Sequence, residues 1–358
     1  MPNWEKNLYG FVRKQDWLNV GSVVPTRPSD PIDGLFGDDK TDNLVATWES
    51  IASEYQIPMM AQFHGFDTES QTTFRVPIDT HNIEKGLIKV KLNQSERLRA
   101  LKNSGVQGDE ALYDYVLDDG IRLADQVITR TKVAKNELMA TGKVTIKENN
   151  LELTVDYGVP ASQTAYTLDV SPSADIPAQI QAIIDDATAK GVTISGFLTA
   201  KKNVTKMRAN ASIQKAINGA IGAGALVRQD ALRAYLEDEF GILMVVTNDL
   251  TYGASAVIDP STGRPNITSK RYYPDNKITF FATNPAGRIG TGLWGNPPEV
   301  DTTDFFEGSN SALSPYVYIM QWMEKDPAVL WTKASGLFMP VLYNPNSLFI
   351  ATVEDNGV

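Results

Sequence analysis

The longest regular pattern along the chain predicts one long helix over residues 109–141. Its apolar positions recur at intervals of four and seven residues and are Leu112, Val116, Leu123, Val127, Ala134 and Leu138. Acidic residues at 109 and 110 suit the positive end of a helix, and Gly142 suits its C-terminal end. At ~1.5 Å per residue such a helix is roughly 45–50 Å long. This length exceeds that of an average globular helix and indicates a structural spine.

Alternating apolar and polar positions predict strands on both sides of this helix. After it, residues 144–146 and 151–155 alternate on either side of a polar turn, which is typical of a hairpin. Before it, residues 59–95 predict a two-stranded projection, with strand candidates at 74–76 and 86–92 joined by a polar connection. A lone hairpin is marginally stable in water, so we expect its own domain or another subunit to support it.

The first 58 residues predict an arm. Three prolines between Val24 and Pro31 favour an extended path. Leu44, Trp48, Ile51 and Tyr55 then stand at helical spacing before Pro58, which predicts a short helix. The aromatic side chains of this arm need a surface to cover them, either on the arm's own domain or on a neighbouring molecule.

Residues 173–322 alternate between helix and strand patterns. We predict helices over 176–189, 204–217 and 230–240, and strands over 192–198, 242–246 and 277–281. This order indicates a second lobe of α/β character inserted into the chain. The tail from Leu337 to Val353 is strand-rich again.

Composition narrows the range of functions. The chain has 358 residues, of which 42% are hydrophobic, enough for a substantial core and more than one lobe. A net charge of −10 argues against tight sequence-reading contacts with nucleic acid, but it suits the wall of a DNA container, because the wall would repel the packaged polymer. The absence of cysteine excludes disulfides and thiolate chemistry. With no signal-peptide pattern and no long apolar run, we expect no membrane association.

Candidate chemistry is sparse. The run Gly290-Thr291-Gly292-Leu293-Trp294-Gly295 matches a dinucleotide-binding pattern, but prolines follow it where a phosphate site needs a helix N-terminus. The two histidines, His64 and His81, have no second strong ligand nearby at metal spacing. Acidic pairs on the predicted helices fit solvated helix faces. We therefore expect no catalytic residue, no cofactor and no metal, and no enzymatic activity.

Several stretches carry a resemblance to a known family. They are residues 137–146 at the end of the long helix, 155–158, 274–278, 284–288 and 335–345. Together with the order of arm, projection, long helix, hairpin, inserted lobe and strand-rich return, they resemble the major capsid proteins of tailed bacteriophages, and within these the lambda-like major capsid protein E family. The resemblance covers most of the chain from the projection onward.

The resemblance implies an α+β fold with five regions. These are an N-terminal arm (1–58), an extended loop (59–95), a peripheral domain with the spine helix (96–172), an inserted axial domain (173–322) and a return to the peripheral domain (323–358). It implies a subunit that self-assembles into pentamers and hexamers of an icosahedral shell around double-stranded DNA, without reading its sequence. It also implies as partners a separate scaffolding protein, a portal and a decoration protein, assembly in the host bacterial cytoplasm, and a final location in the virion capsid.

The extended loop supplies the predicted intersubunit contacts. The candidate residues are Phe74, Arg75, Asp79, His81, Glu84, Lys85 and Ile88. Three alternatives remain open on the sequence alone. One is an encapsulin-like shell protein of a bacterial nanocompartment, another is an α/β enzyme with a nucleotide site around residues 290–295, and the last is a phage tail or sheath subunit that forms tubes.

Overall fold

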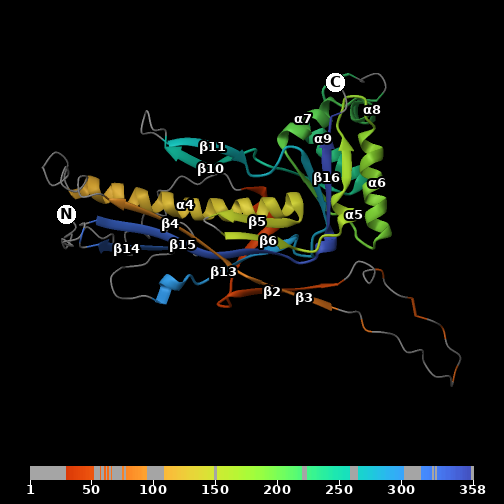
Figure 1. Cartoon of the computed structure of the whole chain (residues 1–358). Coiled ribbons are helices and arrows are strands. Elements are labelled where there is room, and N and C mark those ends of the chain that lie inside the picture. The colour runs from red at the N-terminus through yellow and green to blue at the C-terminus, as the bar shows by residue number, and fades with distance from the viewer. Residues whose placement is uncertain are drawn as a thin grey trace.

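The structure is a computed structural model of the chain. It describes residues 30–51, 57, 60–61, 63, 66, 75, 78–94, 109–148, 151–219, 224–258, 265–301, 316–324, 326 and 329–355. Within these ranges the chain forms two lobes and two projecting ribbons (Figure 1). The prolines at 25 and 28 and the candidate Phe74 lie outside the described residues.

The first lobe is built on the long helix. It contains α2 (Pro31–Leu35), β1 (Phe36–Lys40), β4 (Gly86–Gln94), α4 (Asp109–Thr141), β5 (Lys143–Glu148), β6 (Leu151–Asp156), β13 (Gly290–Gly295), η2 (Pro298–Asp301), β14 (Tyr318–Glu324) and β15 (Val329–Leu342). The bounds of α4 confirm the predicted spine, and β5 and β6 confirm the predicted hairpin. The helix ends at Gly142, whose positive φ of 71° suits glycine and whose N–H donates to the Leu138 carbonyl at 2.8 Å.

The first sheet lies against α4. Its strand order is β1-β13-β15-β14, with β4 on the opposite edge of β15. Because β15 is 14 residues long, it pairs with β14 along its first half and with β13 along its second half. Leu123, Val127 and Leu138 of α4 are buried in the same core as Phe338 and Met339 of β15. The helix and this central strand therefore form one rigid platform (Figure 1).

The second lobe stands at the C-terminal end of α4. It contains α5 (Ala161–Thr164), β7 (Tyr166–Asp169), α6 (Ile176–Ala189), β8 (Gly196–Thr199), α7 (Lys201–Ala209), α8 (Ala211–Asn218), α9 (Gln229–Phe240), β9 (Leu243–Val246), β12 (Lys277–Phe281), η3 (Pro345–Ser347) and β16 (Leu348–Glu354). Its sheet has the order β7-β16-β12-β8-β9. The helix predicted over 204–217 is broken at Asn210, whose side-chain oxygen accepts from the Ile213 N–H and caps α8.

The two faces of the second sheet have different partners. Ile278 and Phe280 of β12 join the core beneath the helices of this lobe. The side chains that alternate with these along β12 point to the opposite face of the sheet, because successive side chains of a strand point to opposite faces. Phe281 joins the core of the first lobe, and the Thr279 hydroxyl donates to the Met139 carbonyl of α4 at 2.7 Å. One strand thus connects both lobes.

Strand pairing crosses the domain boundaries that the resemblance implies. β16 falls in the predicted return segment 323–358, yet it pairs with β12 and buries Phe349 in the core of the second lobe. β13 lies wholly, and β14 largely, inside the range 173–322 predicted for the axial domain, yet both strands belong to the first sheet. The chain therefore crosses between the lobes more often than a single insertion would require.

The predicted helix at residues 44–55 is wrong, because residues 45–51 form strand β2 (Val45–Ile51). Burial alternates there with a period of two, since Ala46 and Trp48 are buried while Val45 is exposed. β2 pairs over seven residues with β3 (Ile78–Glu84), the stretch predicted as a connection. The predicted second strand of the projection, at residues 86–92, is β4, which pairs with β15 in the first sheet. The projection is therefore a ribbon of β2 and β3.

A second ribbon was not predicted. Strands β10 (Thr251–Ile258) and β11 (Pro265–Arg271) pair with each other alone among the described residues, with a register shift after Gly253. The Tyr272 hydroxyl donates to the Thr129 hydroxyl of α4 at 3.4 Å and holds the base of this ribbon beside the helix.

The glycine-rich run at 290–295 is strand β13, paired on one side with β1 and on the other with β15. A Cβ on Gly290 would lie 2.2 Å from the Val341 carbonyl oxygen, and one on Gly292 would lie 2.3 Å from the Asp38 carboxylate. The glycines are therefore explained by close packing of neighbouring strands and not by a phosphate site. The nucleotide-site alternative loses the sequence feature on which it rested.

We predict that Gly290→Ala destabilises the fold by about 1–3 kcal/mol or more, because the new methyl group has no space between two strands. Gly34→Ala is the matched control, since a Cβ there meets no atom within 4 Å. Urea unfolding of the unassembled variants measures the difference. Equal stability of the two variants would contradict the packing explanation.

Candidate intersubunit surfaces

The β2–β3 ribbon is anchored to the first lobe at its base. Trp48 of β2 is buried and stacks on His81 of β3 and on Tyr157, with 5.3 Å between ring centroids in each case. The Tyr157 hydroxyl donates to the Pro340 carbonyl of β15 at 2.6 Å, and burial raises the pKa of this hydroxyl. The anchor fixes the direction in which the ribbon leaves the body (Figure 1).

Large apolar side chains are exposed in the segment between the two strands of the ribbon. Ile57 is 49% exposed, Met60 88%, and Phe63 and Phe66 are completely exposed. Four large apolar side chains exposed within ten residues of the chain mark a candidate site of contact with another molecule. We name these four residues the loop patch. Sequence reasoning missed it, because an apolar residue at every third position does not by itself show that the side chain is exposed.

The predicted contact residues divide into two groups. Arg75 and Glu84 are exposed, and His81 is half-buried against Trp48, so part of each remains accessible to a neighbour. Asp79 pairs with Ser50 in the ribbon, but its side chain lies outside the described residues, as does Phe74. Of the remaining candidates, Lys85 is buried in the chain's own fold, and Ile88 is half-buried against it.

Lys85 and Ile88 have contacts within their own chain that the sequence did not predict. Ile88 packs against the core of the first lobe. Lys85 is only 3% exposed, and its ammonium group donates to the Thr41 carbonyl (2.9 Å), the Thr41 hydroxyl (2.8 Å) and the Trp294 carbonyl (3.1 Å). Burial lowers the pKa of Lys85, while the nearby Asp42 carboxylate acts in the opposite direction. This lysine joins the base of the ribbon to β13 through hydrogen bonds within its own chain.

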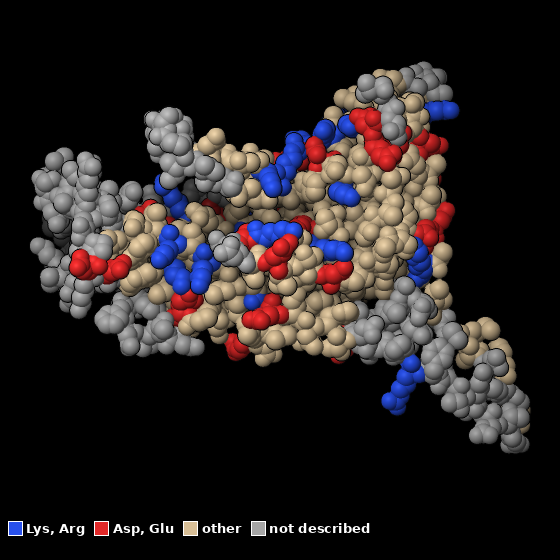
Figure 2. Space-filling view, in the orientation of Figure 1, with Lys and Arg blue, Asp and Glu red and all other residues tan. Residues whose placement is uncertain are grey.

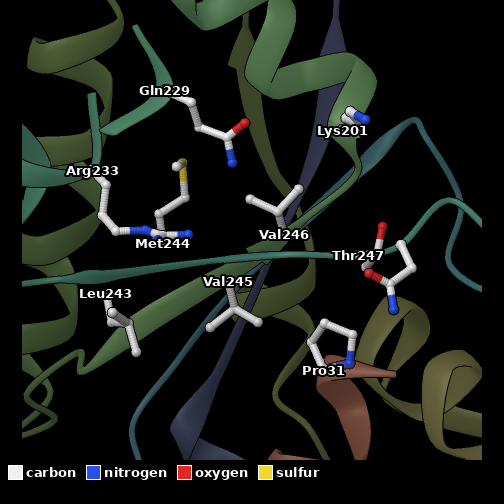
Figure 3. Close-up of a pocket in the computed structure, with 10 residues that line it drawn as sticks. Pro31, Lys201, Gln229, Arg233, Leu243, Met244, Val245, Val246 and Thr247 are labelled. Carbon is white, nitrogen blue, oxygen red and sulfur yellow. The ribbon is translucent and has the colours of Figure 1, made fainter. Parts of the chain in front are cut away.

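A second surface feature is a cleft of about 530 Å³ beside strand β9 (Figure 3). Its lining comprises Pro31, Lys201, Gln229, Arg233 and residues 243–248. β9 is an edge strand, since among the described residues it pairs only with β8. The lining carries two cationic side chains and no carboxylate.

The opposite edge of the same sheet is covered by α6. Its Gln179 side chain accepts from the Asp169 N–H at 2.8 Å and donates to the Asp169 carbonyl at 3.3 Å, which closes part of the free edge of β7. Nearby, Lys190 donates to Asp186 at 2.6 Å, and this bond together with one from Tyr166 holds the pKa of the Asp186 carboxyl below its ordinary value.

Other kinds of site find little support in the described part of the chain. It contains no group of three histidine, aspartate or glutamate side chains arranged to hold a metal ion. None of its helices combines the length and apolar character needed to cross a membrane. The surfaces described above are features of a protein that binds other macromolecules.

Two solved structures share this fold. A protein assigned as a capsid protein of a prophage of E. coli CFT073 superimposes with a TM-score of 0.54 at 12% identity, covering 96% of this chain and 99% of that one. A phage-related protein from Bordetella bronchiseptica RB50 gives 0.50 at 10% identity, covering 96% and 97%. The fold is thus that of tailed-phage capsid proteins, as the resemblance implied.

The family follows from the sequence match. The family model described as phage major capsid protein E matches residues 64–353, and the chain therefore belongs to this family of major capsid proteins, which are structural proteins of the virion. No curated protein matches the chain. A weaker likeness, with a TM-score of 0.43 at 9% identity and covering 93% of this chain and 94% of the other, links it to an encapsulin of Synechococcus elongatus PCC 7942. The matching family favours the phage capsid over the nanocompartment alternative.

We predict that Lys85→Met lowers the free energy of unfolding by about 1–3 kcal/mol, because it leaves three oxygen acceptors without their donor in a buried position. Lys89→Met, at an exposed position on β4, is the matched control and should change stability by no more than about 0.5 kcal/mol. Urea unfolding of the unassembled chain measures both. An unchanged stability in Lys85→Met would show that this lysine does not hold the ribbon in place.

Proposed function

We propose that this capsid protein forms the pentamers and hexamers of an icosahedral shell that encloses double-stranded phage DNA. In this proposal the first lobe is the peripheral domain and the second lobe is the axial domain. The β2–β3 ribbon with residues 52–77 is the extended loop, which lies on an adjacent subunit. Assembly takes place in the host bacterial cytoplasm, and no catalytic step is involved.

The observation that carries the proposal is the loop patch. Burying one fully exposed phenylalanine or methionine side chain contributes about 1.5–3 kcal/mol. Covering Met60, Phe63 and Phe66 on a neighbour would therefore favour association by several kcal/mol per subunit, before the entropy of association is subtracted. Repeated around a closed ring, such a contact is enough to hold many copies together.

The net charge of the chain supports the proposal that the shell encloses DNA without recognising its sequence. The net charge of −10 leaves no general attraction for phosphate, so the polymer would slide past the wall instead of adhering to it. A shell of this kind needs further partners, for which we propose a separate scaffolding protein, a portal at the site of DNA entry and a decoration protein on the outer surface.

We predict that Phe63→Asp abolishes particle formation and leaves a folded, soluble chain. The Phe63 side chain is completely exposed, so its loss should not disturb the fold, whereas an unpaired carboxylate is costly to bury on a neighbour. Phe63→Leu keeps an apolar side chain and serves as the matched control, which should still assemble. Electron microscopy of the three purified proteins measures particle formation.

Normal shells from Phe63→Asp would contradict the role of the loop patch. Tubes formed by the unmodified chain would point to a tail or sheath subunit. Shells isolated from infected cells with a protein cargo and no DNA would instead favour a nanocompartment.

A further inference from the structure

The second lobe presents two unlike flanks, one at each edge of its sheet. At the first flank, the Leu243 and Thr247 N–H groups donate inward to the Ser195 and Thr199 carbonyls. The backbone groups of the residues between them, Met244 and Val246, therefore face the outer edge. An uncovered strand edge is a template for association, which proteins usually cover or protect.

The cleft at this edge combines positive charge with apolar surface. Lys201 and Arg233 are exposed, and neither has an ion-pair partner among the described residues. Leu243 is 50% exposed, and in Figure 3 it points together with Val245 to the face of β9 opposite Arg233 and Lys201, so apolar and cationic side chains flank the strand from its two faces. The acidic run at 237–239 at the end of α9 does not line the cleft. The cleft thus suits a partner that offers a carboxylate flanked by small apolar groups.

The second flank has the complementary character. The outer face of α6 exposes Ala178, Gln181, Ala182, Asp185, Thr188 and Ala189. Small side chains allow another surface to approach closely. In the described part of the chain, the Asp185 carboxylate accepts a side-chain hydrogen bond from Gln181 alone, at 2.7 Å. Figure 2 shows acidic side chains along the edge of the lobe where Figure 1 places α6.

We infer that the outer face of α6 in one copy docks in the β9 cleft of the next copy, with the Asp185 carboxylate facing Lys201 and Arg233. The inference rests on the proposed function and adds to it the surfaces through which neighbouring second lobes meet. Because α6 and β9 lie at opposite edges of the sheet, the contact is head-to-tail. Repeated contacts of this type close into a ring when the rotation between successive copies divides a full turn, as pentamers and hexamers require.

Exchange of the charges tests the contact. Arg233→Asp and Asp185→Arg each place like charges together, and each should lower the yield of assembled rings and shells by about tenfold or more at low salt. The double variant restores opposite charges and should recover assembly. Arg228→Asp, an exposed cation just before α9 that does not line the cleft, is the matched control and should assemble normally.

Engineered cysteines give a direct readout of the same contact, because the chain has no cysteine of its own. A mixture of Ala182→Cys chains and Leu243→Cys chains, assembled together and then oxidised, should give a disulfide-linked dimer on a non-reducing gel. A pairing between different chains is required, since each chain carries one cysteine. Leu243→Cys mixed with Ile267→Cys, an exposed position on β11, should give none.

The outcomes separate this inference from the proposed function. If the unmodified chain forms shells but the single charge variants assemble as well, or no dimer appears, the α6 contact is overturned and the shell function stands. In that case another occupant fills the cleft, such as the chain's own residues 1–29, which lead to Pro31 in its lining. If the unmodified chain never assembles, the proposed function fails first.

Discussion

The structure depends on the burial of the last turns of α4 between two sheets. Leu138 and Met139 are completely buried, and the Met139 carbonyl accepts the hydroxyl of Thr279 from the second sheet. One turn earlier, Lys135 is 1% exposed, and its ammonium group lies 2.9 Å from the Asp38 carboxylate of β1. Because both lobes and the N-terminal strand pack on this short segment, their relative orientation is fixed without disulfides.

This rigid centre positions the two assembly surfaces. The β2–β3 ribbon is held at its base by Trp48 and Lys85, both of which contact the first lobe. The β9 cleft is lined by Pro31, which belongs to the N-terminal segment held on α4. Copies built on such a platform can form many weak contacts in a defined geometry, and defined geometry is what a closed shell requires.

Secondary structure was predicted best where the apolar residues follow one helical period over several turns. α4, α6 and α9 follow a helical period over many turns, and their predicted bounds agree with the structure to within one residue. β2 was missed because Trp48 and Ile51 happen to stand at helical spacing while the burial itself alternates. The β10–β11 ribbon has too little apolar alternation for its strands to be predicted from the sequence. The lobe to which β16 belongs can be assigned only once its pairing partner β12 is known.

The intersubunit residues were harder to predict than the fold. A pattern shows which residues are apolar, but only the folded chain shows which of them remain uncovered. Ile88 and Phe63 look alike in the sequence, yet the former packs against its own core and the latter is completely exposed. Lys85 looked like a surface charge and is a buried donor to three oxygens. Burial, and not residue type, separates contacts within the chain from contacts between chains.

The central claim is that this chain's exposed apolar surface is completed by other copies of itself. A high-resolution reconstruction of particles assembled from the unmodified chain tests it most directly. Our account predicts that Met60, Phe63 and Phe66 lie in contact with a neighbouring subunit. Particles in which these three side chains remain in solvent would contradict it.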